Sequence, residues 1–170
     1  MTTGEQIRGQ ELFLRQQSNR NNNGPVIICD GIQTPENFGS ILRVADATGC
    51  KNIWLLDSDL DLKSKRLSKL ARSADQHLNI EHLTLENFAE KLKQFKQLCA
   101  LEITTQSTNL FETNISGCDG IVIGHESLGI RAELLNYCHS AIHLPMFGTN
   151  GSMNVSHALT VFLYEWRRQQ

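Results

Sequence analysis

The chain has 170 residues, of which 40% are hydrophobic and 20% charged, and its formal net charge is −2. This length suffices for one domain with a buried core, and the composition excludes a disordered or fibrous protein. Because the protein is not a polycation, any contact with nucleic acid has to come from a local basic patch. We expect a short polar extension at residues 1–24, with one helix around residues 6–16, ahead of a single domain at residues 25–170.

Several classes of protein are excluded by what the sequence lacks. No apolar run approaches the roughly 18 residues of a membrane span, and the start has no signal-peptide core. The five cysteines include no C-x-x-C pair, so we expect reduced, mostly buried thiols in a soluble, cytoplasmic protein. Cys138, His139 and His143 resemble a fragment of a metal site, but partners at zinc spacing are missing. Packing within a strand is the favoured interpretation, and no metal is expected.

From Pro25 onward, short apolar runs alternate with segments of helical periodicity. Strands are predicted at residues 26–29, 52–56, 78–83, 97–103, 120–123 and 140–144. Helices are predicted at residues 37–48, 85–98, 132–137 and 155–168. This alternation predicts an α/β fold with a mostly parallel sheet covered by helices on both faces. Ligands of such sheets bind beyond the carboxyl ends of the strands, where the loops around residues 37, 124–129 and 144–156 should converge.

The loop at residues 144–156 joins a strand to the last helix and is rich in glycine and amides. Ser152 and Asn154 are both good helix N-caps, and backbone N–H groups at a helix start suit a polar ligand. No G-x-G-x-x-G follows a strand, and neither a P-loop nor a G-x-S-x-G elbow occurs. These absences argue against an ordinary doubly wound nucleotide enzyme.

Three blocks of sequence carry a specific resemblance. They read N-F-G-S-I-L-R-V-A at residues 37–45, G-H-E-S-L-G at 124–129 and L-P-M-F-G-T-N-G-S-M-N-V-S-H-A at 144–158. In order and spacing they resemble the three motifs of the SpoU/TrmH branch of the SPOUT superfamily. Leu144, Met153 and His157 depart from the usual pattern, and the likeness covers about residues 25–168.

The resemblance implies an S-adenosylmethionine-dependent methyltransferase that modifies a ribose 2′-O of tRNA or rRNA. It also implies a carboxyl-terminal deep trefoil knot, which the general rules of chain topology would not predict, and a homodimer. The cofactor would bind bent in the knot. The residues implied to hold it are Leu101, Gly124, Leu144, Gly148, Ser152 and Met153. Gly124, Gly129, Gly148 and Gly151 would allow close backbone approach that a Cβ would block.

By the same resemblance Arg43 carries the reaction, supported by Asn37, Glu126 and Asn154. The family proposal makes Arg43 a base assisted by an RNA phosphate. Arginine is normally locked in its charged form, so we favour a role in clamping the phosphate and orienting the 2′-OH. Glu126 either accepts a hydrogen bond from the ribose or caps the short helix at Ala132.

A basic run without any acid lies at residues 63–72. Phosphate contact is favoured over a merely solvated face, because the run follows a strand in an otherwise net negative protein. The residues concerned are Lys63, Lys65, Arg66, Lys69 and Arg72. The main rival function is a catalytically silent RNA-binding member of the same fold. The sequence does not identify the RNA or the nucleotide.

Overall fold

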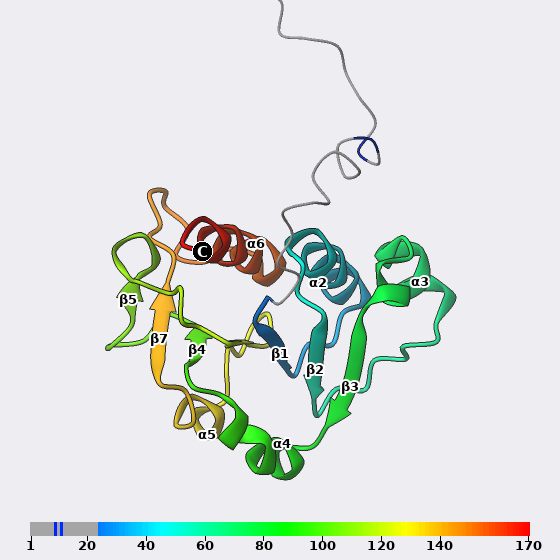
Figure 1. Cartoon of the computed structure of the whole chain (residues 1–170), viewed down its shortest axis with the longest axis horizontal. Helices are drawn as coiled ribbons and strands as arrows, with labels where there is room; N and C mark the ends of the chain where they lie inside the picture. The colour runs from blue at the N-terminus through cyan, green and yellow to red at the C-terminus, as the bar shows by residue number, and fades with distance from the viewer. Residues whose placement is uncertain (1–8, 10, 12–23) are drawn as a thin grey trace, which may run out of the picture.

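The computed structural model describes residues 9, 11 and 24–170 and shows a sheet with helices on both faces (Figure 1). The helix predicted around residues 6–16, and with it nearly all of the proposed extension, lies outside the described residues. The parallel α/β class predicted from the alternating pattern is confirmed. Among the described residues, no helix combines the length and apolar character needed to cross a lipid bilayer.

Seven strands form the sheet in the order β3-β2-β1-β6-β4-β7-β5, and each strand pairs in parallel with its neighbours. Their bounds are β1 Val26–Asp30, β2 Asn52–Leu56, β3 Asn79–Leu83, β4 Leu98–Leu101, β5 Thr108–Asn109, β6 Gly120–Ile123 and β7 Ser140–His143. Strand β5 was not predicted, because two polar residues give no apolar run. Strand β7 lies between β4 and β5, so the connection from β4 to β5 spans the position that β7 occupies.

Helices α2 and α6 cover one face of the sheet, and α4 and α5 lie on the other (Figure 1). The bounds are α2 Pro35–Thr48, α3 Lys65–Ala71, α4 Leu85–Lys91, α5 Ala132–Leu135 and α6 Val155–Arg168, with 3₁₀ turns at Ala74–His77, Leu92–Gln94 and Leu110–Glu112. Several predicted boundaries were wrong, most of them by one or two residues. Helix α2 begins before Asn37, because Thr34 caps it and Pro35 fits its first turn. Helix α4 ends at Lys91 instead of residue 98, and a 3₁₀ turn follows it.

Each face of the sheet packs its own core because successive strand residues point to opposite sides. In β1, Ile27 and Cys29 face the core under α2 and α6, which also buries Phe38 and Phe162. Ile28 faces the opposite core, which centres on a set of aromatic side chains. There Trp54 makes edge contacts with Phe88 and Phe95, with ring centroids 6.0 and 5.4 Å apart.

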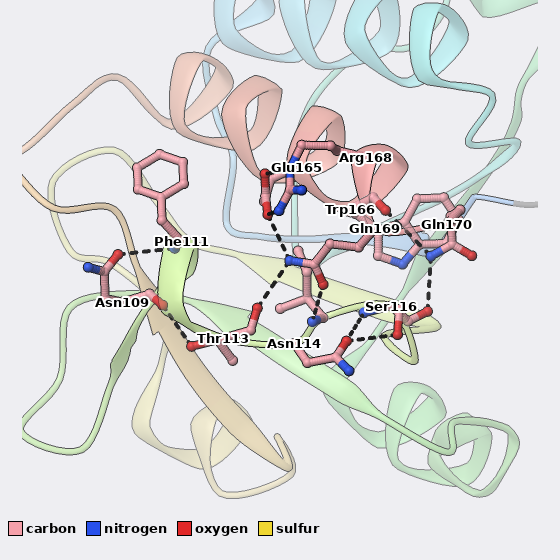
Figure 2. A network of polar contacts seen from close by, with 11 residues as sticks. Asn109, Phe111, Thr113, Asn114, Ser116, Glu165, Trp166, Arg168, Gln169 and Gln170 are labelled. Carbon is pink, nitrogen blue, oxygen red and sulfur yellow. Dashed lines mark hydrogen bonds and ion pairs between the residues drawn. The ribbon is translucent and has the colours of Figure 1, made fainter.

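The carboxyl end of α6 is tied to the segment between β5 and β6 (Figure 2). Gln169 Oε1 accepts a hydrogen bond from Ile115 N at 2.7 Å, and Gln169 Nε2 donates to Thr113 O at 3.1 Å and Glu165 Oε1 at 2.8 Å. Hydrogen bonds from Arg168 and Gln169 lower the pKa of Glu165 to about 2. The carboxylate therefore stays ionised at neutral pH, and the network stays intact.

Replacing Gln169 with alanine should lower the free energy of unfolding by about 1–3 kcal/mol, since backbone groups of Thr113 and Ile115 lose their partners. Gln170→Ala is the matched control. Gln170 is exposed, and its Nε2 donates to Ser116 O at 3.1 Å and to Trp166 O at 3.4 Å. Urea unfolding of both variants measures the difference. Equal losses would show that the Gln169 contacts add nothing specific.

Candidate functional site

A cavity of about 520 Å³ lies beyond the carboxyl ends of β4, β6 and β7, next to the start of α6. This volume is in the range of small-molecule sites, roughly 300–1,000 Å³. The loops after β6 and β7 both line it, as predicted. Five of the six residues expected to hold a cofactor are among the lining residues: Leu101, Gly124, Leu144, Ser152 and Met153. Gly148 is not, and no protein atom lies within 4 Å of the position its Cβ would take.

A chain of hydrogen bonds joins the three motifs at the edge of this cavity. Glu126 Oε1 accepts from Asn37 Nδ2 at 2.6 Å and from Thr34 Oγ1 at 2.9 Å. Asn37 Oδ1 accepts from Asn154 Nδ2 at 2.9 Å. Asn154 Oδ1 in turn accepts from Ser156 N and Ser156 Oγ, which makes Asn154 the N-cap of α6. Glu126 Oε1, Asn37 Oδ1 and Asn154 Oδ1 each accept from a donor in this chain, so the side chains are oriented in advance of any ligand.

Thr34 is a site residue that the sequence reasoning missed. Its hydroxyl accepts from Asn37 N at 3.4 Å as the cap of α2 and donates to Glu126. The signal was the pair Thr34-Pro35, a capping residue followed by a proline suited to the first helical position. By contrast, Ser152 does not cap a helix, because α6 starts after Asn154.

Glu126 is held as a carboxylate. Partial burial would raise its pKa, but hydrogen bonds from Asn37, its own backbone N–H and Thr34, with a smaller contribution from His125, bring the pKa below its ordinary value. The group is therefore ionised at neutral pH and acts only as an acceptor. The alternative in which Glu126 caps the short helix is wrong, because α5 has no side-chain cap and Glu126 bonds to α2 instead.

Two glycines shape the loop that carries Glu126. A Cβ on Gly124 would lie 2.2 Å from the carbonyl carbon of Gly129, so only glycine fits there. Gly129 has a φ of 70°, in the left-handed region. The close approach at Gly124 is therefore between the two sides of its own loop, whereas a Cβ on Gly129 would lie 2.6 Å from Glu102 Oε2. For Gly151, as for Gly148, no protein atom comes near.

An unpredicted ion cluster anchors the end of the same loop. Arg131 N and Nε donate to the two carboxylate oxygens of Asp30 at 2.8 and 2.7 Å, and Arg131 Nη1 donates to Asp57 Oδ2 at 2.6 Å. Asp30 ends β1 and is only 2% exposed, and Asp57 directly follows β2. The carboxyl ends of three neighbouring strands, β1, β2 and β6, are thus joined through one guanidinium.

Arg43 does not line the cavity of its own chain. It lies six residues beyond Asn37 on α2, about 9 Å further along the axis and roughly 120° around it. The side chain is exposed, and within residues 24–170 it makes no hydrogen bond or ion pair. Arg43 is therefore separate from the network that Asn37, Glu126 and Asn154 form.

The basic run also lies away from the cavity. Helix α3 packs against α2 near the β3 end of the sheet, whereas β7 lies near the other end (Figure 1). The basic run follows a strand, as expected, but none of its residues lines the cavity of the same chain. Arg66 pairs with Glu36 at the start of α2. Among the residues that the structure describes, the remaining four cations form no ion pair: Lys63, Lys65, Lys69 and Arg72.

The histidines of the possible metal fragment have other partners. His139 Nδ1 accepts from Leu98 N at 3.0 Å, and His143 Nδ1 lies 3.0 Å from Ser107 Oγ. Across the described part of the chain, no three His, Cys, Asp or Glu side chains gather as a metal site would require.

Comparison with known proteins agrees with the motif assignment. The family model of the SpoU rRNA Methylase family matches residues 24–164. A Staphylococcus saprophyticus protein assigned to the TrmH family of tRNA/rRNA methyltransferases is 31% identical over 161 residues, covering 94% of this chain and 65% of its own length. The 23S rRNA (guanosine-2′-O-)-methyltransferase RlmB of Neisseria meningitidis is 32% identical over 148 residues, covering 85% of this chain and 58% of its own length.

Among solved structures, the A. aeolicus TrmH/SpoU tRNA modifying enzyme superimposes with a TM-score of 0.77 at 26% identity, covering 94% of this chain and 82% of that one. The chain spans less than two thirds of both curated relatives. The match to the family model covers most of the chain and includes all three motifs that meet at the cavity. This protein belongs to the SpoU rRNA Methylase family.

Proposed function

We propose that this protein transfers a methyl group from S-adenosylmethionine to a ribose 2′-O of tRNA or rRNA. The observation that carries the proposal is the hydrogen-bonded chain from Glu126 through Asn37 to Asn154 at the edge of a ligand-sized cavity. A catalytically silent RNA-binding protein would not require this arrangement. The family's name and those of the relatives support the same reaction.

The cavity suits the methyl donor. Apolar side chains on one wall fit an adenine and a thioether, and Glu102 supplies a carboxylate for the cationic end of the ligand. Backbone groups at Leu101, Gly124, Leu144, Ser152 and Met153 would hold the cofactor. When bound, S-adenosylmethionine supplies an already activated methyl group, so the protein has only to bind and orient the acceptor hydroxyl.

Glu126 and Arg43 would do the orienting. Glu126 Oε1 is occupied by Thr34 and Asn37, whereas within the described residues Glu126 Oε2 accepts no hydrogen bond. Oε2 is thus available to accept from a ribose hydroxyl. Arg43, a permanent cation with five donors, would clamp the adjacent phosphate and align the 2′-OH. Deprotonation is not assigned to either side chain.

We also propose that the active form is a homodimer in which Arg43 completes the partner's cavity. The support is that Arg43 is exposed, lies outside its own cavity and, within the described residues, forms no hydrogen bond or ion pair. The basic residues of α3 lie on the same side of the molecule as α2. One protomer would then contribute the donor site and the other the cations that hold RNA.

We propose two further properties, one implied by the family resemblance and one by the cysteines. The trefoil knot is supported by the position of β7 between β4 and β5, which requires the chain around residues 102–107 to pass over β7. A cytoplasmic location is supported by the five cysteines, all of which are free thiols.

Charge reversal at Lys65 and Lys69 should weaken RNA binding about tenfold and reduce the slope of log affinity against log salt by about 1.5. Both side chains are exposed and, within residues 24–170, unpaired. Lys93→Glu, an equally exposed lysine beyond α4 on the opposite side of the sheet, is the control. Filter binding at several salt concentrations measures the effect. An RNA affinity that does not change with salt would refute a role of the basic run in RNA binding. An equal loss of affinity in Lys93→Glu would refute it as well.

The function itself is tested by ligand titration followed by methyl transfer. Calorimetry should detect binding of S-adenosylhomocysteine but not of NAD or ATP, which separates this proposal from a nucleotide enzyme. Labelled methyl groups should then pass from S-adenosylmethionine to bulk tRNA or rRNA. Cofactor binding without transfer to any RNA would favour the silent RNA-binding alternative.

A further inference from the structure

The imidazole of His125 lies inside the loop that carries Glu126. The two ends of the loop pair with each other: His125 N donates to Gly129 O at 3.1 Å, and Gly129 N donates to His125 O at 2.9 Å. Within this closed loop, His125 Nδ1 accepts from Ser127 N at 3.0 Å and from Leu128 N at 3.3 Å. One ring nitrogen therefore holds both amides at the tip of the turn.

The donors fix the protonation of the ring. A backbone N–H only donates, so Nδ1 has to present its lone pair, and the neutral ring carries its proton on Nε2. The arrangement is that of an Asx turn in which an imidazole nitrogen replaces the carboxamide oxygen. An asparagine places its Oδ1 where histidine places Nδ1, so asparagine is the natural substitute at this position.

The turn determines the direction of Glu126. This residue lies between His125 and the two bound amides, and its carboxylate points across to Thr34 and Asn37 on a separate segment. The side chain of Glu126 is 21% exposed. Without the Nδ1 contacts, the amides of Ser127 and Leu128 lose their acceptor, and the turn is free to rotate Glu126 away from Asn37.

We propose that His125 is a positioning residue whose unprotonated Nδ1 fixes the Glu126 turn, so that this turn opens when Nδ1 takes up a proton. The inference rests on the proposed function only for its activity measurement. A proton on Nδ1 converts the acceptor into a donor and removes both amide bonds together. Glu126 Oε2 lies 4.0 Å from Nδ1, so the new donor would draw the carboxylate toward its own loop.

The groups around the His125 ring are compatible with protonation of Nδ1. Gly31, after β1, lies beside His125: a Cβ built on it would be 3.8 Å from His125 Cβ and 4.0 Å from His125 Cδ2. The neighbouring Asp30 is engaged with Arg131. Across the cavity the titratable groups are Glu102 and His143. Glu126, with its lowered pKa, stays ionised throughout the range in which an imidazole titrates, so it does not produce the change itself.

Three variants test the proposal: His125→Ala, His125→Asn and His125→Gln. His125→Ala should lower kcat by about 10²-fold, the cost of misplacing a catalytic group by about 1 Å, with little change in KM for the methyl donor. His125→Asn should recover most of that loss, because Oδ1 replaces Nδ1. His125→Gln should not, since its acceptor lies one bond further out. The acidic limb of the wild-type kcat profile should be absent in His125→Asn.

Amide hydrogen exchange provides a measurement that does not depend on activity. Ser127 and Leu128 should be protected in the wild type and in His125→Asn, and should exchange faster in His125→Ala and in acid. Protection that persists in His125→Ala, or an acidic limb that persists in His125→Asn, would overturn the proposal. If no form methylates RNA, the proposed function fails, and the exchange rates still decide the role of His125.

Discussion

Replacing Arg43 with alanine should reduce methyl transfer about 10³-fold while leaving the affinity for S-adenosylmethionine nearly unchanged. The reason is its position: Arg43 lies on the exposed face of α2, outside the cavity that would hold the donor. Arg43→Lys is the control, because it keeps the charge and loses the planar fork of donors. Single-turnover kinetics and calorimetry measure transfer and binding separately. An alanine variant that methylates normally would refute the role of Arg43.

Mixed dimers determine whether Arg43 acts across the subunits. Arg43→Ala and Glu126→Ala homodimers should both be inactive. After mixing and exchange, about half of the dimers carry one chain of each kind, and each such dimer has one intact site if Arg43 serves the partner. Activity should then return to about a quarter of the wild-type value. If Arg43 serves its own chain, mixing restores nothing.

Replacing Arg131 with alanine should lower the free energy of unfolding by about 3 kcal/mol. The change leaves the carboxylate of Asp30 buried without its counter-charge and removes the link to Asp57. This loss of free energy of unfolding is at the low end of the range for breaking a buried ion pair. The reason is that the Arg131 side chain is 37% exposed, so solvent screens its charge.

Arg66→Ala is the control for this experiment, since its partnership with Glu36 is at the surface and should contribute less than about 1 kcal/mol. Adding Asp30→Asn to Arg131→Ala should recover part of the loss, because the buried group is then neutral. Thermal and urea unfolding supply the measurements. Equal losses for Arg66→Ala and Arg131→Ala would mean that burial of Asp30 has no energetic consequence.

The sequence predicted the convergence of the motifs because each follows a strand, and parallel strands end at a common edge. Asn37, Glu126 and Asn154 meet there as expected. The ion cluster of Arg131 could not be predicted in the same way, since 101 residues separate it from Asp30 and no local pattern marks the pair. The position of His125 inside its turn could not be predicted either, because it depends on the backbone conformation of residues 125–129.

Two predictions were wrong because a sequence pattern does not fix the local geometry of the backbone. The apolar spacing of Leu85, Phe88, Leu92 and Phe95 fits one long helix, but the chain tightens into a 3₁₀ turn after Lys91 and still buries Phe95. Gly148 was assigned to the cofactor because it belongs to a motif, although a motif does not state which of its glycines contacts anything. The same holds for Arg43: the motif identifies the residue, but its position outside the cavity follows only from the geometry of α2.

The order of the strands also determines when this protein becomes functional during its synthesis. Strands β1, β2 and β3 are made first and lie side by side. Strand β7 pairs with β4 and β5, and Ile142 lies opposite both Leu101 and Thr108. Because β7 is synthesised after β4 and β5, the β5 end of the sheet is completed late. The cavity takes lining residues up to Ala158. A chain that stops before Ala158 therefore lacks part of the cavity in which we propose that the methyl donor binds.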